Sequence, residues 1–241
     1  MFPKYIIRFL SNNIKLKTKY INYSFLLKYT MARILVFDVE TTGLPSKYNA
    51  KPQDTNLWPF IVQFSWIVYD TETMDMLEIK DYIIKLPDGK TVPEESTKIH
   101  GITNEMMLEK GTSIENVLYE FYEHLSKCQT LIAHNLKFDK SMATVESIRN
   151  HINPQFNNVI EFCTMNYGNA ICNLTRVNYR NQVVSKFPKL IELYQQLFNE
   201  VPNNLHNSLN DVLVCFRCYY KMRYNEDILR EDEAMAMFEC F

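Results

Sequence analysis

The chain has 241 residues, of which 46% are hydrophobic and 22% are charged, so it can bury one sizeable core and a single main domain is expected. Its formal net charge of -2 supplies no general attraction for a polyanion, so any contact with nucleic acid needs a local basic patch or bound cations. No apolar run approaches the roughly 18 residues of a membrane-spanning helix, which predicts a soluble protein without a membrane partner.

The two ends of the chain differ from its middle in charge. Residues 1–30 carry six basic side chains and no acidic one, whereas residues 223–241 carry six acidic side chains against two arginines. We expect the first segment to be an appended extension, disordered or partner-binding, or the product of a start codon placed too far upstream. Organelle targeting is less favoured because the segment has a single arginine. We expect the last segment to be an acidic tail, helical or frayed, which leaves residues 31–222 as the folded domain.

Between these ends the sequence changes from strand patterns to alternating strand and helix patterns. Three segments, 34–39, 61–69 and 78–85, are rich in β-forming residues. Apolar residues then recur at helical spacing over 114–125, 137–149, 190–198 and 209–222, and short strands are expected at 130–133 and 159–165. This order of elements predicts an α/β domain with a mixed sheet.

Six cysteines are scattered along the chain without a repeated short spacing: Cys128, Cys163, Cys172, Cys215, Cys218 and Cys240. Cys215 and Cys218 form a Cys-x-x-Cys pair, but it lies in an apolar run of helical period with no second pair nearby. We therefore expect thiols in a helix core and a reducing, intracellular compartment, rather than zinc ligands or disulfides.

The first expected strand ends in two acidic residues, Asp38 and Glu40, which are two positions apart. Alternate residues of a strand point to the same face, so both carboxylates share one face while Val39 points into the opposite layer. Two ionised carboxylates about 4 Å apart repel by about 4 kcal/mol at an effective dielectric constant of about 20. A bound divalent cation would remove this cost; the alternative is a strand end that exposes both acids to water.

Two further acidic residues stand at the starts of expected helices. Asp139 follows the strand at 130–133, and a helix-capping role is the simpler explanation for this residue alone. Asp211 lies three residues after Ser208, a spacing that fits a capping box with Asp in place of Glu. His206 precedes this helix and has no such structural explanation.

Together these residues form three motifs: Asp-x-Glu at 38–40, His-Asn-x-x-Phe-Asp at 134–139 and His-x-x-x-x-Asp at 206–211. In order and local spacing they resemble the three exonuclease motifs of the DEDDh (DnaQ-like) family of 3'-to-5' exonucleases. The segments 98–103, with its His-Gly-Ile-Thr, and 186–194 also resemble stretches of that family. The resemblance covers residues 31–222, and histidine at position 206 favours the DEDDh branch over the branch with tyrosine in that role.

The resemblance implies a ribonuclease H-like fold with a five-stranded mixed β-sheet flanked by α-helices. It implies that Asp38, Glu40, Asp139 and Asp211 hold two Mg²⁺ ions, which Mn²⁺ can replace, with Asp38 bridging them; oxygen ligands suit both ions. A histidine titrates near neutral pH, so His206 is expected to accept a proton from the attacking water. Hydrolysis would release nucleoside 5'-monophosphates. The Thr41, Thr42, Gly43 and Leu44 turn would approach the terminal nucleotide, with Gly43 allowing close backbone contact.

A second binding surface is expected from the residues themselves. The stretch 162–191 contains no acidic residue but has basic and aromatic side chains in alternation: Tyr167, Arg176, Tyr179, Arg180, Lys186, Phe187 and Lys189. Cations can follow phosphates while rings stack on bases, so Arg176 and Arg180 are candidate contacts to a single strand. A solvated loop with buried aromatic residues is the equally weighted alternative.

The expected partner is the 3' end of a nucleic acid, single-stranded DNA in the first place and RNA as the open alternative. Two other functions stay open: a proofreading or scaffold module that acts only with a polymerase or another protein, and a catalytically silent nucleic acid binder. A non-nuclease phosphoesterase is a weaker third. The segment 48–59, with Trp58, resembles an insertion that could shape substrate choice. The oligomeric state is not predicted.

Overall fold

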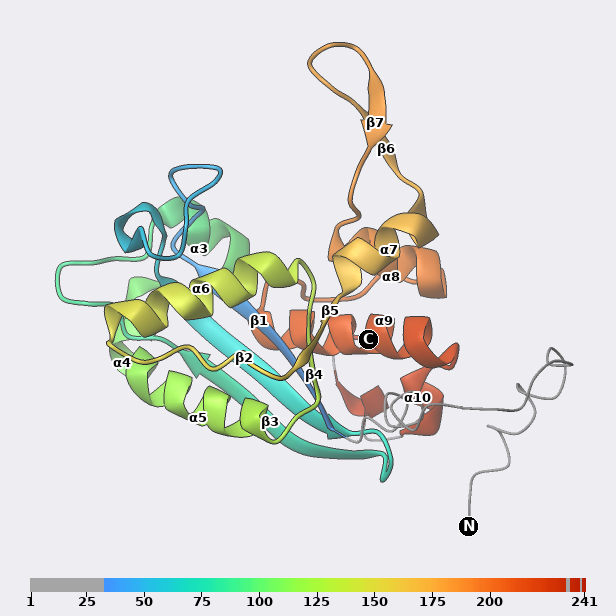
Figure 1. The fold of residues 1–241 in the computed structure, drawn as a ribbon, viewed down its shortest axis with the longest axis horizontal. Helices are drawn as coiled ribbons and strands as arrows, with labels where there is room; N and C mark the ends of the chain where they lie inside the picture. Colours follow the sequence, from blue (N-terminus) through green and yellow to red (C-terminus); the bar gives the residue numbers. More distant parts are fainter. Residues whose placement is uncertain (1–32, 233–234, 239) are drawn as a thin grey trace, which may run out of the picture. The chain divides into compact units, whose positions relative to one another are not determined.

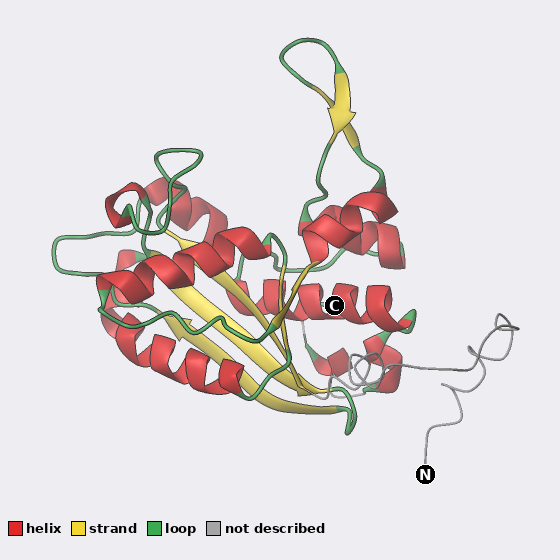
Figure 2. Cartoon of the chain, in the orientation of Figure 1, coloured by secondary structure: helices red, strands yellow, loops and turns green. Residues whose placement is uncertain are grey.

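The computed structural model describes residues 33–232, 235–238 and 240–241, so the expectation for residues 1–30 lies outside the described residues. These residues are arranged around one central sheet (Figures 1 and 2). Five strands lie side by side in the order β3-β2-β1-β4-β5. Their bounds are β1 (Arg33–Thr41), β2 (Ile61–Asp70), β3 (Asp75–Ile83), β4 (Thr130–Ala133) and β5 (Ile160–Cys163).

The sheet is mixed, because β1, β2 and β3 form an antiparallel meander whereas β4 and β5 run parallel to β1. The prediction of an α/β domain with a five-stranded mixed sheet is therefore confirmed, and each expected strand is present. All ten residues of β2 are buried, which is typical of a strand with both faces covered. The edge strand β3 instead alternates between exposed and less exposed positions along most of its length.

The side chains of β1 enter two separate cores. Leu35, Phe37 and Val39 pack in a layer with the helices α5 (Ile114–Ser126) and α6 (Leu136–Arg149), which cover one face of the sheet in Figure 1. Ile34 and Val36 pack in the other layer, with α8 (Leu190–Phe198) and α9 (Ser208–Tyr224). Asp38 and Glu40 continue the second series, so they lie on the α9 face as the strand period requires.

Several short elements are absent from the sequence-based expectation. They are the helices α3 (Glu94–His100), α4 (Asn104–Lys110) and α7 (Thr164–Cys172) and the 3-10 turn η1 (Thr55–Leu57). The helix α10 (Ile228–Glu231) and the 3-10 turn η2 (Met235–Met237) lie in the acidic tail, which was expected to be helical or frayed. The strands β6 (Thr175–Val177) and β7 (Val183–Ser185) form a separate antiparallel hairpin. This hairpin projects from the body of the domain beyond α7 and α8 (Figures 1 and 2), and we call residues 173–188 the arm.

The helix α9 and the residues that follow it are tied together by a buried arginine. Arg217, 3% exposed, donates hydrogen bonds to Asp227 at 2.7 and 2.9 Å and to Glu200 at 2.9 Å, and it also bonds the Tyr194 hydroxyl. Ile228, Met235 and Cys240 are buried in the same core, so these residues of the acidic tail pack on the domain.

Cys215 and Cys218 are both buried within α9, which confirms the prediction that this pair lies in a helix core. None of the described helices is both long enough and apolar enough to cross a membrane.

Candidate active site

Asp38 and Glu40 lie at the carboxyl end of β1, the central strand of the sheet. The pairing of β1 with β2 changes register between Glu40 and Thr41, so the strand leaves the regular ladder immediately after the second carboxylate. The start of α9 is fixed at this point. The Ser208 hydroxyl donates to the backbone carbonyl of Asp38 at 2.7 Å, and the Ser208 backbone N–H donates to Gln63 Oε1 at 3.1 Å.

Asp139 reaches the same place from α6. The chain turns from β4 into this helix through Asn135, which occupies the N-cap position in the left-handed conformation, with φ of 69°. Asp139 therefore lies one turn inside the helix, and the interpretation of it as a helix cap is wrong. Its side chain is buried, 3% exposed, and its Oδ2 atom has no hydrogen-bond partner within the described residues.

The capping-box interpretation of Ser208 and Asp211 is also wrong. The N-cap of α9 is Asn207, whose side chain accepts from the Asn210 backbone N–H at 3.4 Å, and Ser208 is the first residue of the helix. The Asp211 carboxylate accepts instead from the backbone N–H of His206, at 3.3 and 3.4 Å. His206 is exposed, its backbone is in the left-handed conformation with φ of 69°, and its ring lies beside the carboxylate.

The four acidic side chains and the imidazole converge. One ligand atom from each of Glu40, His206 and Asp211 lies within 4.8 Å of the others. Burial raises the pKa of Asp38 to about 7. Burial, followed by repulsion from Asp38, raises the pKa of Glu40 to about 8 and that of Asp211 to about 9. The pKa of Asp139 is raised by burial and by the charges of Asp38 and Glu40.

This cluster fits divalent cations. Burial and mutual repulsion both oppose ionisation of the carboxylates, and within the described part of the chain no lysine or arginine forms an ion pair with any of them. The partnerless Oδ2 atom of Asp139 is a further buried acceptor. Carboxylate oxygens are the ligands that hard divalent ions prefer, so cations would satisfy a donor set that the protein leaves uncompensated.

The turn after β1 is held in a defined shape beside the cluster. The Thr41 hydroxyl donates to the Gly43 carbonyl at 2.6 Å, and Gly43 has φ of 143°, which favours glycine. Thr42 and Phe60 are joined in both directions: Thr42 N–H donates to Phe60 O at 2.9 Å, and Phe60 N–H donates to the Thr42 hydroxyl at 3.0 Å. Leu44 is 81% exposed and thus free to contact a ligand.

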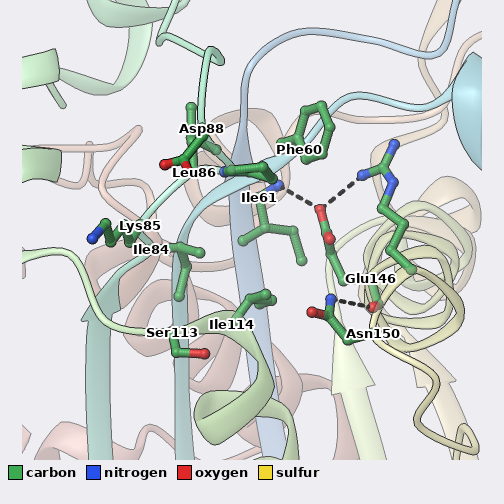
Figure 3. Close-up of a pocket in the computed structure, with 12 residues that line it drawn as sticks. Phe60, Ile61, Ile84, Lys85, Leu86, Asp88, Ser113, Ile114, Glu146 and Asn150 are labelled. Atoms are coloured by element: carbon green, nitrogen blue, oxygen red, sulfur yellow. Dashed lines mark hydrogen bonds and ion pairs between the residues drawn. The ribbon is translucent and has the colours of Figure 1, made fainter.

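The segment that carries Phe60 is clamped by two charged residues of α6. The Arg149 guanidinium donates to the carbonyls of Thr55, Trp58 and Pro59 at 2.6–2.8 Å and lies 4.0 Å from the centre of the Phe60 ring. Glu146 accepts from Arg149 at 2.8 Å and from the Ile61 backbone N–H at 3.2 Å (Figure 3). The expected insertion at 48–59 is therefore anchored at its end, and it is joined through Phe60 to the turn beside the carboxylates.

His100, which was not among the expected site residues, is buried near the Thr41 backbone. Its Nδ1 accepts from the Ile102 backbone N–H at 3.1 Å, and burial lowers its pKa although the Thr41 backbone opposes this. The sequence feature that could have identified His100 is the His-Gly-Ile-Thr of the 98–103 segment, which resembles a stretch of the exonuclease family.

His134 has a structural role within the second motif. Its Nε2 contacts the Pro188 carbonyl at 3.1 Å and its Nδ1 contacts the Thr164 hydroxyl at 3.0 Å. Burial lowers its pKa to about 4, so the ring is neutral; Nε2–H donates and Nδ1 accepts. Thr164 begins α7 and Pro188 ends the arm. One imidazole at the end of β4 therefore contacts both ends of the segment 164–188, which contains α7 and the arm.

The two remaining candidate residues, Arg176 and Arg180, lie on the arm and outside the carboxylate cluster. Both are exposed, and the Arg180 guanidinium lies 5.2 Å from the ring centre of Tyr179, which is 88% exposed. The equally weighted alternative of a loop with buried aromatic residues does not hold for Tyr167, Tyr179 and Phe187, which are all more than half exposed.

Comparison with protein families matches residues 35–219 to the RNase T family, described as Exonuclease. Comparison with curated proteins gave no match. Among solved structures, E. coli exonuclease I in complex with a dT13 oligonucleotide aligns with a TM-score of 0.60 and 18% identity, over 80% of this chain and 42% of that one. This chain thus spans about two fifths of the length of exonuclease I.

Two other solved structures align comparably. The nuclease domain of 3'hExo, a DEDDh family member bound to rAMP, has a TM-score of 0.59 and 14% identity, over 83% of this chain and 96% of that one. A full-length 3'-exonuclease has a TM-score of 0.59 and 12% identity, over 81% and 61% of the two chains. At these identities the likeness shows a shared fold.

Proposed function

The chain belongs to the exonuclease family defined by the RNase T domain, and on this premise we propose that it removes nucleotides one at a time from the 3' end of a single-stranded nucleic acid. The products would be nucleoside 5'-monophosphates. The observation that carries the proposal is the convergence of four uncompensated carboxylates with an exposed imidazole beside them.

Divalent-metal dependence is general for this family. Asp38, Glu40, Asp139 and Asp211 would hold two Mg²⁺ ions, and Mn²⁺ would replace them because it accepts the same oxygen ligands. Such ions, when bound, stabilise negative charge on the attacking and departing oxygens of a phosphodiester. The carboxylates supply the charge that retains the ions, and Ser208 and Gln63 fix the end of β1 against the start of α9.

His206 would act as the general base. Its ring lies beside Glu40 and Asp211 on an exposed loop, where a water molecule can approach. The imidazole would take a proton from that water as its oxygen attacks phosphorus, and the bond from phosphorus to the 3' oxygen of the neighbouring nucleotide would break. The hydrogen bond from the His206 backbone N–H to the Asp211 carboxylate holds the loop that carries His206 close to Asp211.

The terminal nucleotide would bind at Thr41, Thr42, Gly43 and Leu44. The two-way pairing of Thr42 with Phe60 fixes this turn, and the exposed Leu44 offers an apolar surface to a base. Arg176 and Arg180 would contact phosphates further along the strand from the arm. Single-stranded DNA is the proposed substrate, in keeping with the oligonucleotide complexes of exonuclease I, and the rAMP complex of 3'hExo makes RNA the competing one.

The proposal is tested with single-stranded DNA and RNA oligonucleotides labelled at the 5' end. Purified protein incubated with Mg²⁺ or Mn²⁺ should shorten the strand stepwise from the 3' end and release mononucleotides, and a chelator should stop it. The Asp38→Asn variant is the control for contaminating nucleases. Shortening that persists in this variant, or that yields only internal fragments, would show that the assignment is wrong.

A further inference from the structure

A groove lies between α6 and α7, next to the proposed active site. It encloses about 470 Å³ and is lined by Lys137, Ser141 and Thr144 of α6, by Asn166 and Tyr167 of α7, and by Pro52 of the loop that follows β1. Lys137 is two residues from Asp139, so the groove starts within the helical turn that carries one of the four carboxylates. It is thus bordered by the loop on one side and by the helix that leads into the arm on the other.

The α7 side of the groove presents a fixed aromatic ring. Tyr167 stacks on Phe162 with ring centres 4.2 Å apart and an interplanar angle of 7°, and Phe162 is held edge-on by Tyr219 at 4.9 Å. Although one face of its ring is covered by Phe162, Tyr167 remains 58% exposed. A pre-organised ring of this kind loses little side-chain freedom when a nucleobase stacks on it.

The α6 side supplies a cation that the protein leaves uncompensated. Lys137 is exposed and has no ion-pair partner within the described residues, whereas its neighbour Lys140 is bound to Glu161 at 2.5 Å. The Lys140–Glu161 pair is neutral overall, so the net charge of the groove comes from Lys137. One unpaired cation and one open aromatic ring thus line the same groove, and a single strand offers phosphates to the first and bases to the second.

We propose that this groove is the subsite for the nucleotides on the 5' side of the scissile bond, with Tyr167 stacking on a base and Lys137 binding a backbone phosphate. The proposal rests on the proposed function and extends it from the terminal nucleotide to the strand behind it. The groove then links the carboxylates to the arm, since α7 continues into β6. Stacking makes no use of base edges, so binding here is independent of sequence.

Two substrates separate this subsite from the catalytic centre. The p-nitrophenyl ester of thymidine 5'-monophosphate contains the scissile phosphodiester but no upstream nucleotide, whereas a single-stranded decamer contains both. Tyr167→Ala should lower kcat/KM on the decamer by about tenfold, the equivalent of losing one stacked base, and should leave ester hydrolysis unchanged. Tyr167→Phe should restore the wild-type value on the decamer. Lys137→Gln should act in the same direction on the decamer only, and more strongly at low salt.

Matched controls are available on helices that do not line the groove. Tyr119 of α5 is 55% exposed, and Lys110 of α4 is an exposed lysine without an ion pair in the described region; Tyr119→Ala and Lys110→Gln should change neither rate. Equal losses on both substrates for Tyr167→Ala, or no loss on the decamer, would overturn the proposal.

Binding distinguishes failure of the subsite from failure of the proposed function. Fluorescence anisotropy of a labelled decamer, with Ca²⁺ as the divalent ion, measures affinity without requiring cleavage. Tyr167-dependent binding by a wild-type protein that cleaves neither substrate would support the groove and refute the exonuclease mechanism. Cleavage of both substrates with Tyr167-independent binding would refute the groove and leave the mechanism intact.

Discussion

Replacing Arg149 by methionine should destabilise the domain far more than a single surface charge would. The Arg149 side chain is 15% exposed and that of its partner Glu146 is 4% exposed, so the substitution leaves a buried carboxylate without its cation. Removing one partner of a buried pair costs about 3–5 kcal/mol. The carbonyls of Thr55, Trp58 and Pro59 lose a donor as well, so we expect the free energy of unfolding of Arg149→Met to fall by about 4 kcal/mol at pH 7.5.

The pH dependence of this loss identifies its cause. Burial raises the pKa of Glu146, and Arg149 opposes that increase, so the pKa in the folded variant should rise further above its unfolded value. A carboxyl group with a raised folded-state pKa favours folding when protonated, and the penalty develops as pH rises through that pKa. The deficit of Arg149→Met should therefore shrink by at least about 1 kcal/mol between pH 7.5 and pH 5.5, roughly one pKa unit of linkage.

Urea unfolding followed by circular dichroism at both pH values measures these differences. The second substitution Glu146→Gln, made in the Arg149→Met background, should recover part of the loss at pH 7.5 because it removes the stranded charge. Lys98→Met is the matched control, since Lys98 pairs with Glu94 at the surface of α3 and should cost less than about 1 kcal/mol. A loss under about 1 kcal/mol for Arg149→Met, or one that is independent of both pH and Glu146, would refute the argument.

Three further outcomes are expected at the site itself. Asp38→Asn should reduce the rate of cleavage by more than about 100-fold, because mutating a residue that only hydrogen-bonds to a metal ligand already costs up to about 100-fold. In the presence of a chelator the same variant should have a higher melting temperature than the wild type, because one of the mutually repelling buried carboxylates is removed. His206→Ala should lower kcat by about 10²- to 10⁴-fold in steady-state assays with little change in KM. A decrease of kcat and KM by the same factor would argue against a general base. Arg176→Ala combined with Arg180→Ala should weaken binding of single strands and reduce the slope of log affinity against log salt by about 1.4, so an unchanged affinity across a salt titration would remove both residues from the binding surface.

The strands and the long helices were predictable because their signals are local. The apolar run of β1 and the periodic helices α5 and α9 need no tertiary information, and their expected bounds differ from the structure by a few residues. The three motifs likewise placed the five candidate catalytic residues on elements that meet at one edge of the sheet. Convergence itself could be inferred only from the family resemblance, because no local pattern states which strand ends are neighbours.

The wrong capping assignments have a common physical cause. Local sequence rules consider only the nearest helix, and they assigned Asp139 and the Ser208–Asp211 pair to the helices they begin. In the structure, asparagines occupy both N-cap positions, Asn135 and Asn207. Asp139 and Asp211 therefore do not cap these helices, and their carboxylates face the cluster. A carboxylate beside an alternative cap is available for another role, which the spacing alone does not reveal.

Asparagine takes the place that glycine usually has at several helix ends. The chain has only five glycines, and within the described residues asparagine takes the left-handed conformation at most of the non-glycine positions that adopt it. Asn173, Asn199 and Asn225 end α7, α8 and α9 in this way. Asparagine tolerates this conformation better than most residues but also occurs in turns and caps, so it marks a helix end less clearly than glycine does.

The attachment of the arm through His134 has a consequence for how this fold can vary. The segment 164–188, which contains α7 and the arm, is secured to one imidazole at both ends, through Thr164 and Pro188, so the arm can change in length without altering the path of β4 or the start of α6. Exchanging that loop for one of different length or charge should therefore yield enzymes that share the same hydrolytic chemistry and differ in which strands they capture.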